Sequence, residues 1–288
     1  MPELPEVEVV RKSLNNLICG LTINKVDIFN DKLRYKITKK LKKVLKNQKI
    51  ISIKRRAKFL LIQFNNKKTL LIHLGMTGKI FILNRIKNKT YKTSFYYDKK
   101  FKPKHNHLGI KFNSHLDLIY NDVRKFGFIK ILNTQKINLN KHLSNLGPEP
   151  LSKNFNFNYI KKVTRKCTKN IKNFLMDQKY VSGLGNIYVN EILAHSSINP
   201  RKVSYKLDDN DILKIIKNTK KTLFSSIKLG GSSIRDFNNI KGDSGKFQKS
   251  FIIYNREKQK CKKKTCGGII KKTYISGRST FFCKRCQN

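Results

Sequence analysis

Acidic residues are scarce in this sequence. Only 17 Asp and Glu stand against 64 Lys and Arg, which gives a formal net charge of +47. A charge of this size repels itself and indicates a polyanionic partner. Nucleic acid is the first candidate, because neutralised phosphates release counterions. Lys, Ile and Asn are frequent everywhere, so part of the charge reflects compositional bias rather than function.

The sequence also has no long apolar run, no secretory signal and no internal repeat. No apolar stretch reaches the roughly 20 residues that a membrane-spanning helix needs, and the acidic N-terminus differs from the basic start of a signal peptide. We therefore expect a cytoplasmic, nucleoid-associated monomer that does not bind membranes. The length of 288 residues suffices for two domains with their own cores.

The six cysteines fall into an isolated pair and a cluster. Cys19 and Cys167 are predicted to be packing residues. The cluster has the spacing Cys-x4-Cys-x16-Cys-x2-Cys and consists of Cys261, Cys266, Cys283 and Cys286. This spacing predicts a tetrahedral zinc ribbon with one structural Zn²⁺. Disulfides are the alternative, and a reducing compartment disfavours them.

Hydrophobic patterning predicts an α+β chain with a strand-rich part and a helix-rich part. Short apolar segments between turn residues predict an antiparallel β-sandwich or barrel at residues 58–64, 69–73, 79–83, 108–112, 117–120 and 127–132. Helical spacing follows at residues 159–167, 171–178, 186–195 and 208–229, the last capped by Asp208. We expect domains at residues 1–134, 151–250 and 251–288, with a linker at 135–150 that contains Gly147 and Pro148.

The first three residues suggest covalent chemistry. Because the second residue is small, Met1 should be removed, and Pro2 then carries a free secondary amine. An α-amine has a pKa of about 8, so a useful fraction is neutral and nucleophilic at physiological pH. Its attack on a sugar aldehyde carbon gives an iminium cation, which is an electron sink. Glu3 is an adjacent acid or base.

An ordinary helix start is the alternative for this segment. Pro5 suits a first helical turn, and Glu6 and Glu8 suit the positive end of the helix dipole. Helical spacing is carried by Val7, Val10, Leu14 and Leu17. This helix explains the sequence from Pro5 onward but not Pro2 and Glu3, so both interpretations stay open there.

Three further segments carry candidate binding residues. Arg56 and Lys58 would share one face of a strand beside an apolar run, or form a solvated basic edge. Met76 lies in a turn between two glycines, where a methionine can project, and Arg124 and Phe126 precede another glycine. A buried methionine and an ordinary hairpin are the alternatives for these two turns.

A Gly-x-Gly pair ends in Asn186 at the start of a predicted helix. As an N-cap, Asn186 would leave backbone N–H groups exposed to a phosphate. A plain turn is the alternative for this segment.

The N-terminal segment Met-Pro-Glu-Leu-Pro-Glu-Val-Glu resembles bacterial formamidopyrimidine-DNA glycosylases, and the later motifs follow in the family's order along nearly the whole chain. The resemblance implies a bifunctional enzyme that excises oxidised purines, such as 8-oxoguanine and formamidopyrimidines, from duplex DNA. It also implies cleavage of the abasic site by β,δ-elimination through a Pro2 Schiff base. The implied fold is an N-terminal helix on a β-sandwich, then a helix–two-turn–helix domain that ends in the zinc ribbon.

The resemblance also implies roles for individual residues. The implied catalytic residues are Pro2, Glu3, Lys58 and Arg278, the last at a Gly-Arg-Ser-Thr hairpin tip. The implied DNA-binding residues are His73, Met76, His105, Arg124, Phe126, Lys172 and Asn186. The implied base-pocket residues are Glu6, Ser232 and Ser233, where a loop that covers the flipped base begins.

Three of these residues address the problem of base flipping. A base inside the duplex is unreachable, so side chains must hold the stack open after the base leaves it. In the implied arrangement Met76 and Phe126 are apolar wedges, and Arg124 faces the base left without a partner.

The chain departs from the family pattern at two points. Four residues, rather than two, separate Cys261 from Cys266, and a larger knuckle can still close on zinc. Val123-Arg124-Lys125 replaces the usual Pro-Arg-Arg, and a lysine lacks the bidentate fork of arginine.

Two other functions remain as alternatives. A sister glycosylase for oxidised pyrimidines typically has glycine where Leu4 stands, and Arg124 also favours the purine enzyme. A non-catalytic zinc-ribbon protein that binds nucleic acid would not need Pro2, Glu3 and Lys58.

Overall fold

The computed structural model describes residues 2–92, 102–232, 246–263 and 265–287, and they form two compact units. The first unit comprises Met1–Ser144 and Ile227–Gln248, and the second comprises Asn145–Ser226 and Lys249–Asn288. The first boundary falls inside the predicted linker at 135–150. Residues 227–248 belong to the first unit, whereas the sequence predicted one continuous domain at 151–250.

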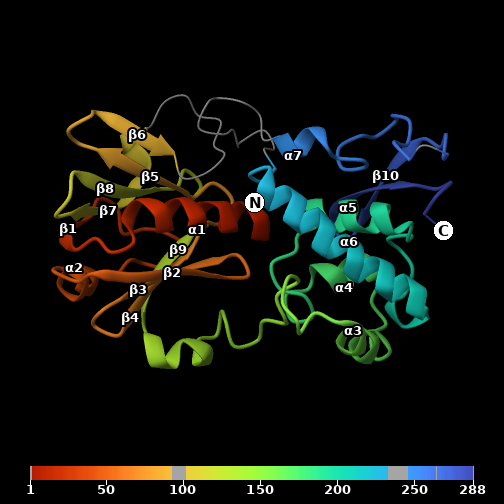
Figure 1. Cartoon of the computed structure of the whole chain (residues 1–288), viewed down its shortest axis with the longest axis horizontal. Coiled ribbons are helices and arrows are strands. Elements are labelled where there is room, and N and C mark those ends of the chain that lie inside the picture. Colours follow the sequence, from red (N-terminus) through yellow and green to blue (C-terminus); the bar gives the residue numbers. More distant parts are fainter. Residues whose placement is uncertain (1, 93–101, 233–245, 264, 288) are drawn as a thin grey trace. The chain divides into compact units, whose positions relative to one another are not determined.

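The first unit is a β-sandwich of antiparallel sheets, as predicted (Figure 1). The five-stranded sheet has the order β1 (Ile23–Ile28), β7 (Asn106–Phe112), β8 (Leu116–Asn121), β5 (Lys79–Asn84) and β6 (Lys89–Lys92). The four-stranded sheet has the order β2 (Ile50–Arg56), β3 (Phe59–Phe64), β4 (Lys68–His73) and β9 (Phe128–Asn133). The shorter elements of this unit are α2 (Lys40–Leu45), η1 (Pro103–His105) and η2 (Thr134–Leu139).

Helix α1 (Leu4–Ile18) confirms the predicted helix start and completes the core of this unit. In Figure 1 it runs between β5–β8 and β2–β4. Its apolar stripe is buried in one core with residues of both sheets and consists of Val7, Val10, Leu14 and Ile18. The predicted Leu17 is only partly buried, because Ile18 occupies the inward position of the last turn. The sequence therefore anchors its N-terminus on the sandwich.

The predicted position of Lys58 in a strand is wrong. Arg56 ends β2 and pairs with Phe59 of β3, so Ala57 and Lys58 form the turn of a hairpin. Arg56 and Lys58 therefore do not share a strand face. The turn escaped prediction because Ala57 takes the left-handed conformation, with φ of 51°, that glycine or asparagine usually supplies.

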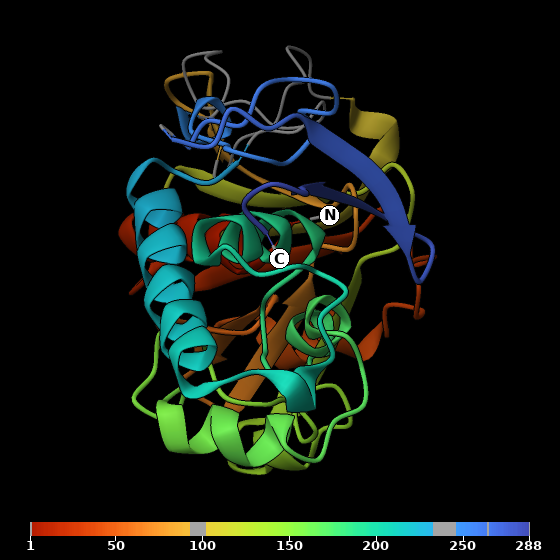
Figure 2. The ribbon, with the colours of Figure 1, turned by 90° about the vertical axis from the view of Figure 1, so that its right-hand side faces the viewer.

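The second unit contains the helices α3 to α5, most of α6, and the zinc ribbon (Figure 2). Its elements are α3 (Phe157–Thr164), α4 (Ile171–Met176), α5 (Asn186–Ser196), η3 (Ser204–Lys206), α6 (Asp209–Lys228), β10 (Ile270–Ile275) and β11 (Arg278–Cys283), and α7 (Lys246–Lys249) lies at the unit boundary. Asp208 caps α6 as predicted, because its Oδ1 accepts from the Asp211 N–H at 2.7 Å. None of the helices in the described part of the chain has the length and apolar character needed to cross a membrane.

The predicted cap of α5 is shifted by one residue. Gly185 is the N-cap, and Asn186 is the first helical residue. The Asn186 side chain is therefore available for another contact, and it donates to the ribbon hairpin.

Candidate active site and nucleic-acid interface

The N-terminal site is built around the start of α1. Glu3 is the N-cap, and its N–H donates to Glu6 Oε2 at 2.9 Å in a reciprocal capping box. Glu6 Oε1 accepts from the N–H and the hydroxyl of Ser232, at 2.8 and 2.9 Å. The structure thus brings Glu6 and Ser232 together next to buried Pro2 and Glu3. Ser233, the third predicted base-pocket residue, lies outside the described residues.

Glycine is required beside this carboxylate. Gly231 has a φ of 88°, and a side chain there would meet Glu6 Oε1 at 3.1 Å. The main chain can approach Glu6 closely only because Gly231 has no Cβ.

An arginine connects α1 to the turn that carries Lys58. Arg55 Nε donates to Glu8 Oε2 at 2.9 Å, and its Nη1 donates to the Ala57 carbonyl oxygen at 3.0 Å. The next residue is Lys58, which is buried and 7% exposed. The Arg55 bridge therefore holds a buried cation near the second turn of the N-terminal helix.

His73 is a neutral hydrogen-bond donor. Burial, followed by the charges of Lys58 and Arg34, lowers the pKa of His73 to about 4. Its Nδ1 accepts from the Gly75 N–H at 3.1 Å, so we assign the remaining ring proton to Nε2. The ring packs against Phe59 and Phe128, with centroids 4.9 and 5.4 Å away. A donor of this kind suits a phosphate oxygen.

Two turns of the sandwich meet around a cleft of about 660 Å³. The cleft is lined by Arg34, His73, Gly75, Met76, Arg124, Lys125 and Phe126. Met76 and Phe126 are 37% and 46% exposed, and the Arg124 guanidinium lies 4.7 Å from the centre of the Phe126 ring. Four predicted residues are thus brought together. Arg34 was not predicted from the sequence, because no glycine or turn motif marks it.

His105 belongs to the same neighbourhood, although it does not line the cleft. Its carbonyl oxygen accepts from the Asp122 N–H at 3.0 Å. Partial burial and the charges of Lys104 and Lys102 lower the pKa of His105. Its ring is therefore biased toward the neutral state.

The second unit holds a hairpin with Arg278 exposed at its tip. Lys172 is fully buried, and its ammonium donates to the Ser279 carbonyl oxygen at 3.0 Å and to Thr280 Oγ1 at 2.6 Å. Asn186 Nδ2 donates to the same Ser279 oxygen at 3.0 Å. These contacts fix β11 to α4 and α5. Burial, followed by the charge of Arg278, lowers the pKa of Lys172 to about 8. A contact between Lys172 and DNA stays a prediction.

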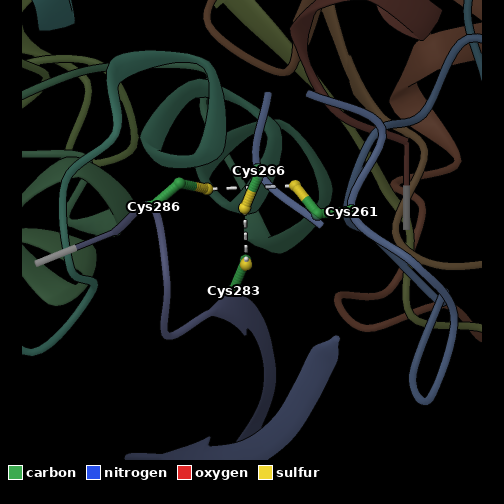
Figure 3. A group of neighbouring side chains, drawn as sticks. All are labelled: Cys261, Cys266, Cys283 and Cys286. Atoms are coloured by element: carbon green, nitrogen blue, oxygen red, sulfur yellow. Dashed lines mark hydrogen bonds between the residues drawn. The ribbon is translucent and has the colours of Figure 1, made fainter. Parts of the chain in front are cut away.

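The four clustered cysteines converge despite the widened spacing (Figure 3). Their sulfur atoms all lie within 4.8 Å of one another, and the Cys261–Cys286 and Cys266–Cys283 pairs are 3.8 and 3.5 Å apart. A zinc–sulfur bond of about 2.3 Å places tetrahedral sulfurs about 3.8 Å apart. The thiols therefore fit one Zn²⁺.

The surroundings of Cys266 also favour metal binding. Hydrogen bonding from the Gly268 backbone lowers the pKa of Cys266 to about 7, which favours the thiolate that binds metal. A Cβ at Gly268 would lie 2.7 Å from Cys283 Sγ, so only glycine fits there. As predicted, Cys19 and Cys167 are packing residues outside this cluster.

Three family models match successive parts of the chain. Residues 1–129 match the formamidopyrimidine-DNA glycosylase N-terminal domain, and residues 146–238 match the formamidopyrimidine-DNA glycosylase H2TH domain. Residues 258–288 match the zinc finger found in FPG and IleRS.

Relatives named formamidopyrimidine-DNA glycosylase match over the full length. The protein of Rickettsia bellii (strain OSU 85-389) is 39% identical over 287 residues, which covers 100% of this chain and 99% of the relative. The protein of Bradyrhizobium sp. (strain BTAi1) is 35% identical over 293 residues, with 100% of both chains covered.

Solved structures agree with these relatives. The complex of Lactococcus lactis Fpg with abasic-site DNA is 35% identical, with a TM-score of 0.86 and 99% of both chains covered. The wild-type Lactococcus lactis Fpg in complex with N7-benzyl-Fapy-dG DNA has the same identity and TM-score, with 100% of both chains covered.

Proposed function

Because this chain belongs to the formamidopyrimidine-DNA glycosylase family, we propose that Pro2 is the nucleophile with which it excises oxidised purines. The chain is a DNA glycosylase for oxidised purines in duplex DNA, and abasic-site lyase activity is expected for the family. One observation carries the assignment to Pro2. This residue directly precedes a buried glutamate that is the N-cap of a helix packed into the sandwich core.

The proposed reaction begins at C1′ of the flipped nucleotide. The lone pair of the Pro2 nitrogen attacks C1′, the bond from C1′ to the base breaks, and the base leaves with a proton. Glu3 transfers a proton as the sugar ring opens, which leaves an iminium between Pro2 and C1′. The iminium acidifies C2′, so loss of a C2′ proton expels the 3′-phosphate. A second elimination expels the 5′-phosphate, and hydrolysis of the iminium frees Pro2.

Cations and polar groups support each stage of this reaction. Lys58 and Arg278 neutralise phosphates beside the lesion, and His73 donates its Nε2–H to a phosphate oxygen. Glu6 and Ser232 contribute to the base pocket. Their mutual hydrogen bonds support this role, because they fix the carboxylate before the substrate arrives.

The cleft of the sandwich suits the opened duplex. We propose that Met76 and Phe126 insert into the base stack and that Arg124 contacts the base opposite the lesion. Their exposure supports this role, since wedge side chains must be accessible before DNA binds.

The zinc ribbon supplies structure rather than chemistry in this scheme. Zn²⁺ bound by the four cysteines would hold the β10–β11 hairpin, which carries Arg278. We also propose that the enzyme is cytoplasmic and nucleoid-associated, because its substrate is duplex DNA and its charge is +47. Imaging of a C-terminal fluorescent fusion together with a DNA stain tests this location.

Trapping with borohydride tests the assignment to Pro2. The substrate is a duplex with 8-oxoguanine opposite cytosine, and borohydride reduces the iminium to a stable amine. We expect wild-type protein to form a covalent complex that peptide mapping locates at Pro2. Pro2→Gly should trap far less, and Glu3→Gln should lose excision while it keeps some cleavage of a preformed abasic site.

An N-terminally extended protein is the matched control. It keeps every side chain but converts the Pro2 nitrogen to an amide, so it should form no complex. Equal trapping of the extended and wild-type proteins would refute Pro2 as nucleophile. DNA binding by the wild type without excision would favour the non-catalytic alternative.

A further inference from the structure

Asp122 joins the two turns that line the cleft of the sandwich. Its side chain is 0% exposed. Its Oδ1 accepts from the Thr77 hydroxyl at 2.5 Å and from the Arg124 N–H at 3.3 Å, and its Oδ2 accepts from the Gly127 N–H at 2.8 Å. One carboxylate therefore contacts the turn that carries Met76 and both ends of the loop that carries Arg124.

Thr77 completes this connection. Its hydroxyl donates to Asp122 and accepts from the Arg124 N–H at 3.0 Å. A single hydroxyl thus bridges the buried carboxylate and the main chain of the exposed arginine. The main chain of Asp122 is fixed as well, since its N–H donates to the His105 carbonyl oxygen and its carbonyl oxygen lies 3.0 Å from His107 Nε2.

The main chains of the two turns touch directly. A Cβ at Gly75 would lie 2.4 Å from the Gly127 nitrogen, and one at Gly127 would lie 1.8 Å from the Tyr120 hydroxyl. Only glycine fits at either position. Lys125 has a φ of 57°, a strained conformation for a lysine that the flanking hydrogen bonds to Asp122 stabilise.

Side-chain packing cannot fix these turns, because their functional side chains are solvent-exposed. Met76 and Phe126 are 37% and 46% exposed, and Arg124 is exposed as well. Burying a carboxylate costs free energy that hydrogen bonds offset only when they are well arranged. A buried carboxylate with three donors therefore fixes the conformation of the loops rather than adding much to the free energy of unfolding.

We propose that Asp122, acting through Thr77, is a positioning residue that holds the Met76 turn and the Arg124 loop as one unit and thereby sets the preference for the base opposite the lesion. The inference rests on the proposed role of Arg124 at that base. A guanidinium can discriminate between opposite bases only if the main chain that carries it is held in place. The main chain of Arg124 is held at its N–H, because Thr77 and Asp122 both accept from it.

Substitution of Thr77 tests the proposal without placing a new charge in the core. Thr77→Val keeps the shape and removes the hydroxyl, whereas Thr77→Ser keeps the hydroxyl and is the matched control. Single-turnover excision of 8-oxoguanine is measured opposite cytosine and opposite adenine. Thr77→Val should lower the cytosine-to-adenine rate ratio about tenfold, because it removes the hydroxyl that bonds to both Asp122 and the Arg124 N–H, and Thr77→Ser should stay within about twofold of wild type.

A double-mutant cycle separates positioning from general damage. If Thr77 acts through Arg124, Thr77→Val should not change the rate ratio further in an Arg124→Ala background. Cleavage of an abasic site in single-stranded DNA has no opposite base, so Thr77→Val should leave that rate unchanged. Asp122→Asn, a second variant, should lower the ratio in the same direction.

The outcomes distinguish this inference from the proposed function. Excision by Thr77→Val with an unchanged ratio, or effects of Thr77→Val and Arg124→Ala that simply add, would overturn the positioning role. Absence of excision by the wild-type protein would instead overturn the proposed function itself.

Discussion

The two units hold their exposed arginines in different ways. In the sandwich, buried Asp122 accepts from Arg124 and Gly127, which lie within five residues of it. In the helical unit, buried Lys172 donates to Ser279 and Thr280, which lie 107 and 108 residues further along the chain. The first tip is fixed within the sandwich, by residues of its own loop and by Thr77, whose hydroxyl bonds to both Asp122 and the Arg124 N–H. The second is fixed only once the ribbon has formed and docked, so it should depend on zinc and on a distant lysine.

Zinc removal should have the largest effect and should separate the two tips. We expect chelation, or Cys266→Ser, to lower DNA cleavage by about a hundredfold or more, because a structural zinc contributes on the order of 10 kcal/mol to folding of a small ribbon. Elemental analysis before and after chelation, with parallel activity assays, gives the result. Cys19→Ser is the control outside the cluster. A metal-free protein with full activity would contradict the dependence on zinc.

Lys172 should have the next largest effect, and the effect should fall on function more than on stability. Lys172→Met removes the charge and keeps the apolar stem, but it loses both donors to β11. We expect abasic-site cleavage to fall about ten- to a hundredfold through misplacement of Arg278. Lys162→Met, at an exposed lysine of α3, is the matched control.

The pH dependence of unfolding provides a second readout of Lys172. Its pKa is about 8 in the folded protein, against 10.5 for an ordinary lysine. Between these values the unfolded chain binds more protons, so the free energy of unfolding should rise with pH, by on the order of 3 kcal/mol in total. Urea titrations across this range should lose the rise in Lys172→Met but not in Lys162→Met.

The sequence revealed the central strands of the sandwich, but of the four edge strands it revealed only β9. The predicted segments correspond to β3, β4, β5, β7, β8 and β9, while β1, β2 and β6 were not predicted as separate strands. All three are edge strands. An edge strand has one neighbour and more exposed positions, so its apolar signal is weak.

The sequence also identified exposed residues at the candidate site, but not the buried polar side chains that fix their position. Motifs marked Met76, Arg124 and Arg278, because glycines and turns are visible in a sequence. The buried polar groups behind them, Asp122 and Lys172, became apparent only from contacts across the fold. Nothing in the sequence around Lys172 indicates that its ammonium donates to β11.

His73 should produce an acid-sensitive stability in the sandwich, the counterpart of the alkaline effect of Lys172. Its folded pKa of about 4 lies below the ordinary 6.5, so the unfolded chain binds more protons between these values. The free energy of unfolding should therefore fall as pH drops from 6.5 to 4, by an amount on the order of 3 kcal/mol. His73→Asn keeps an acceptor for the Gly75 N–H and should not show this fall in the free energy of unfolding.

The control for His73 is His115→Asn, at an exposed histidine of the same unit. Chemical unfolding at several pH values compares the three proteins. Equal acid sensitivity in wild type and His73→Asn would show that other groups cause it.

Substitution of Arg124 should have the smallest effect on the rate and the greatest selectivity for the opposite base. Arg124→Ala should reduce excision opposite cytosine more than opposite adenine. A guanidinium can donate to O2 and N3 of cytosine, whereas adenine offers N1 beside a donor that repels it. One such contact discriminates by about 1–3 kcal/mol, so we expect the rate ratio to fall about tenfold or somewhat more.

Arg278→Ala, by contrast, should slow cleavage without regard to the opposite base. If Arg278 binds phosphate, its loss should slow cleavage by a similar factor opposite all four bases, and the salt dependence of binding should weaken by about one counterion. Arg124→Ala should leave that salt dependence unchanged. Single-turnover rates against four opposite bases at two salt concentrations therefore separate base readout from phosphate binding. A uniform loss in Arg124→Ala would mean that both tips bind phosphate, and the buried carboxylate behind Arg124 would then position a charge rather than a reader of sequence.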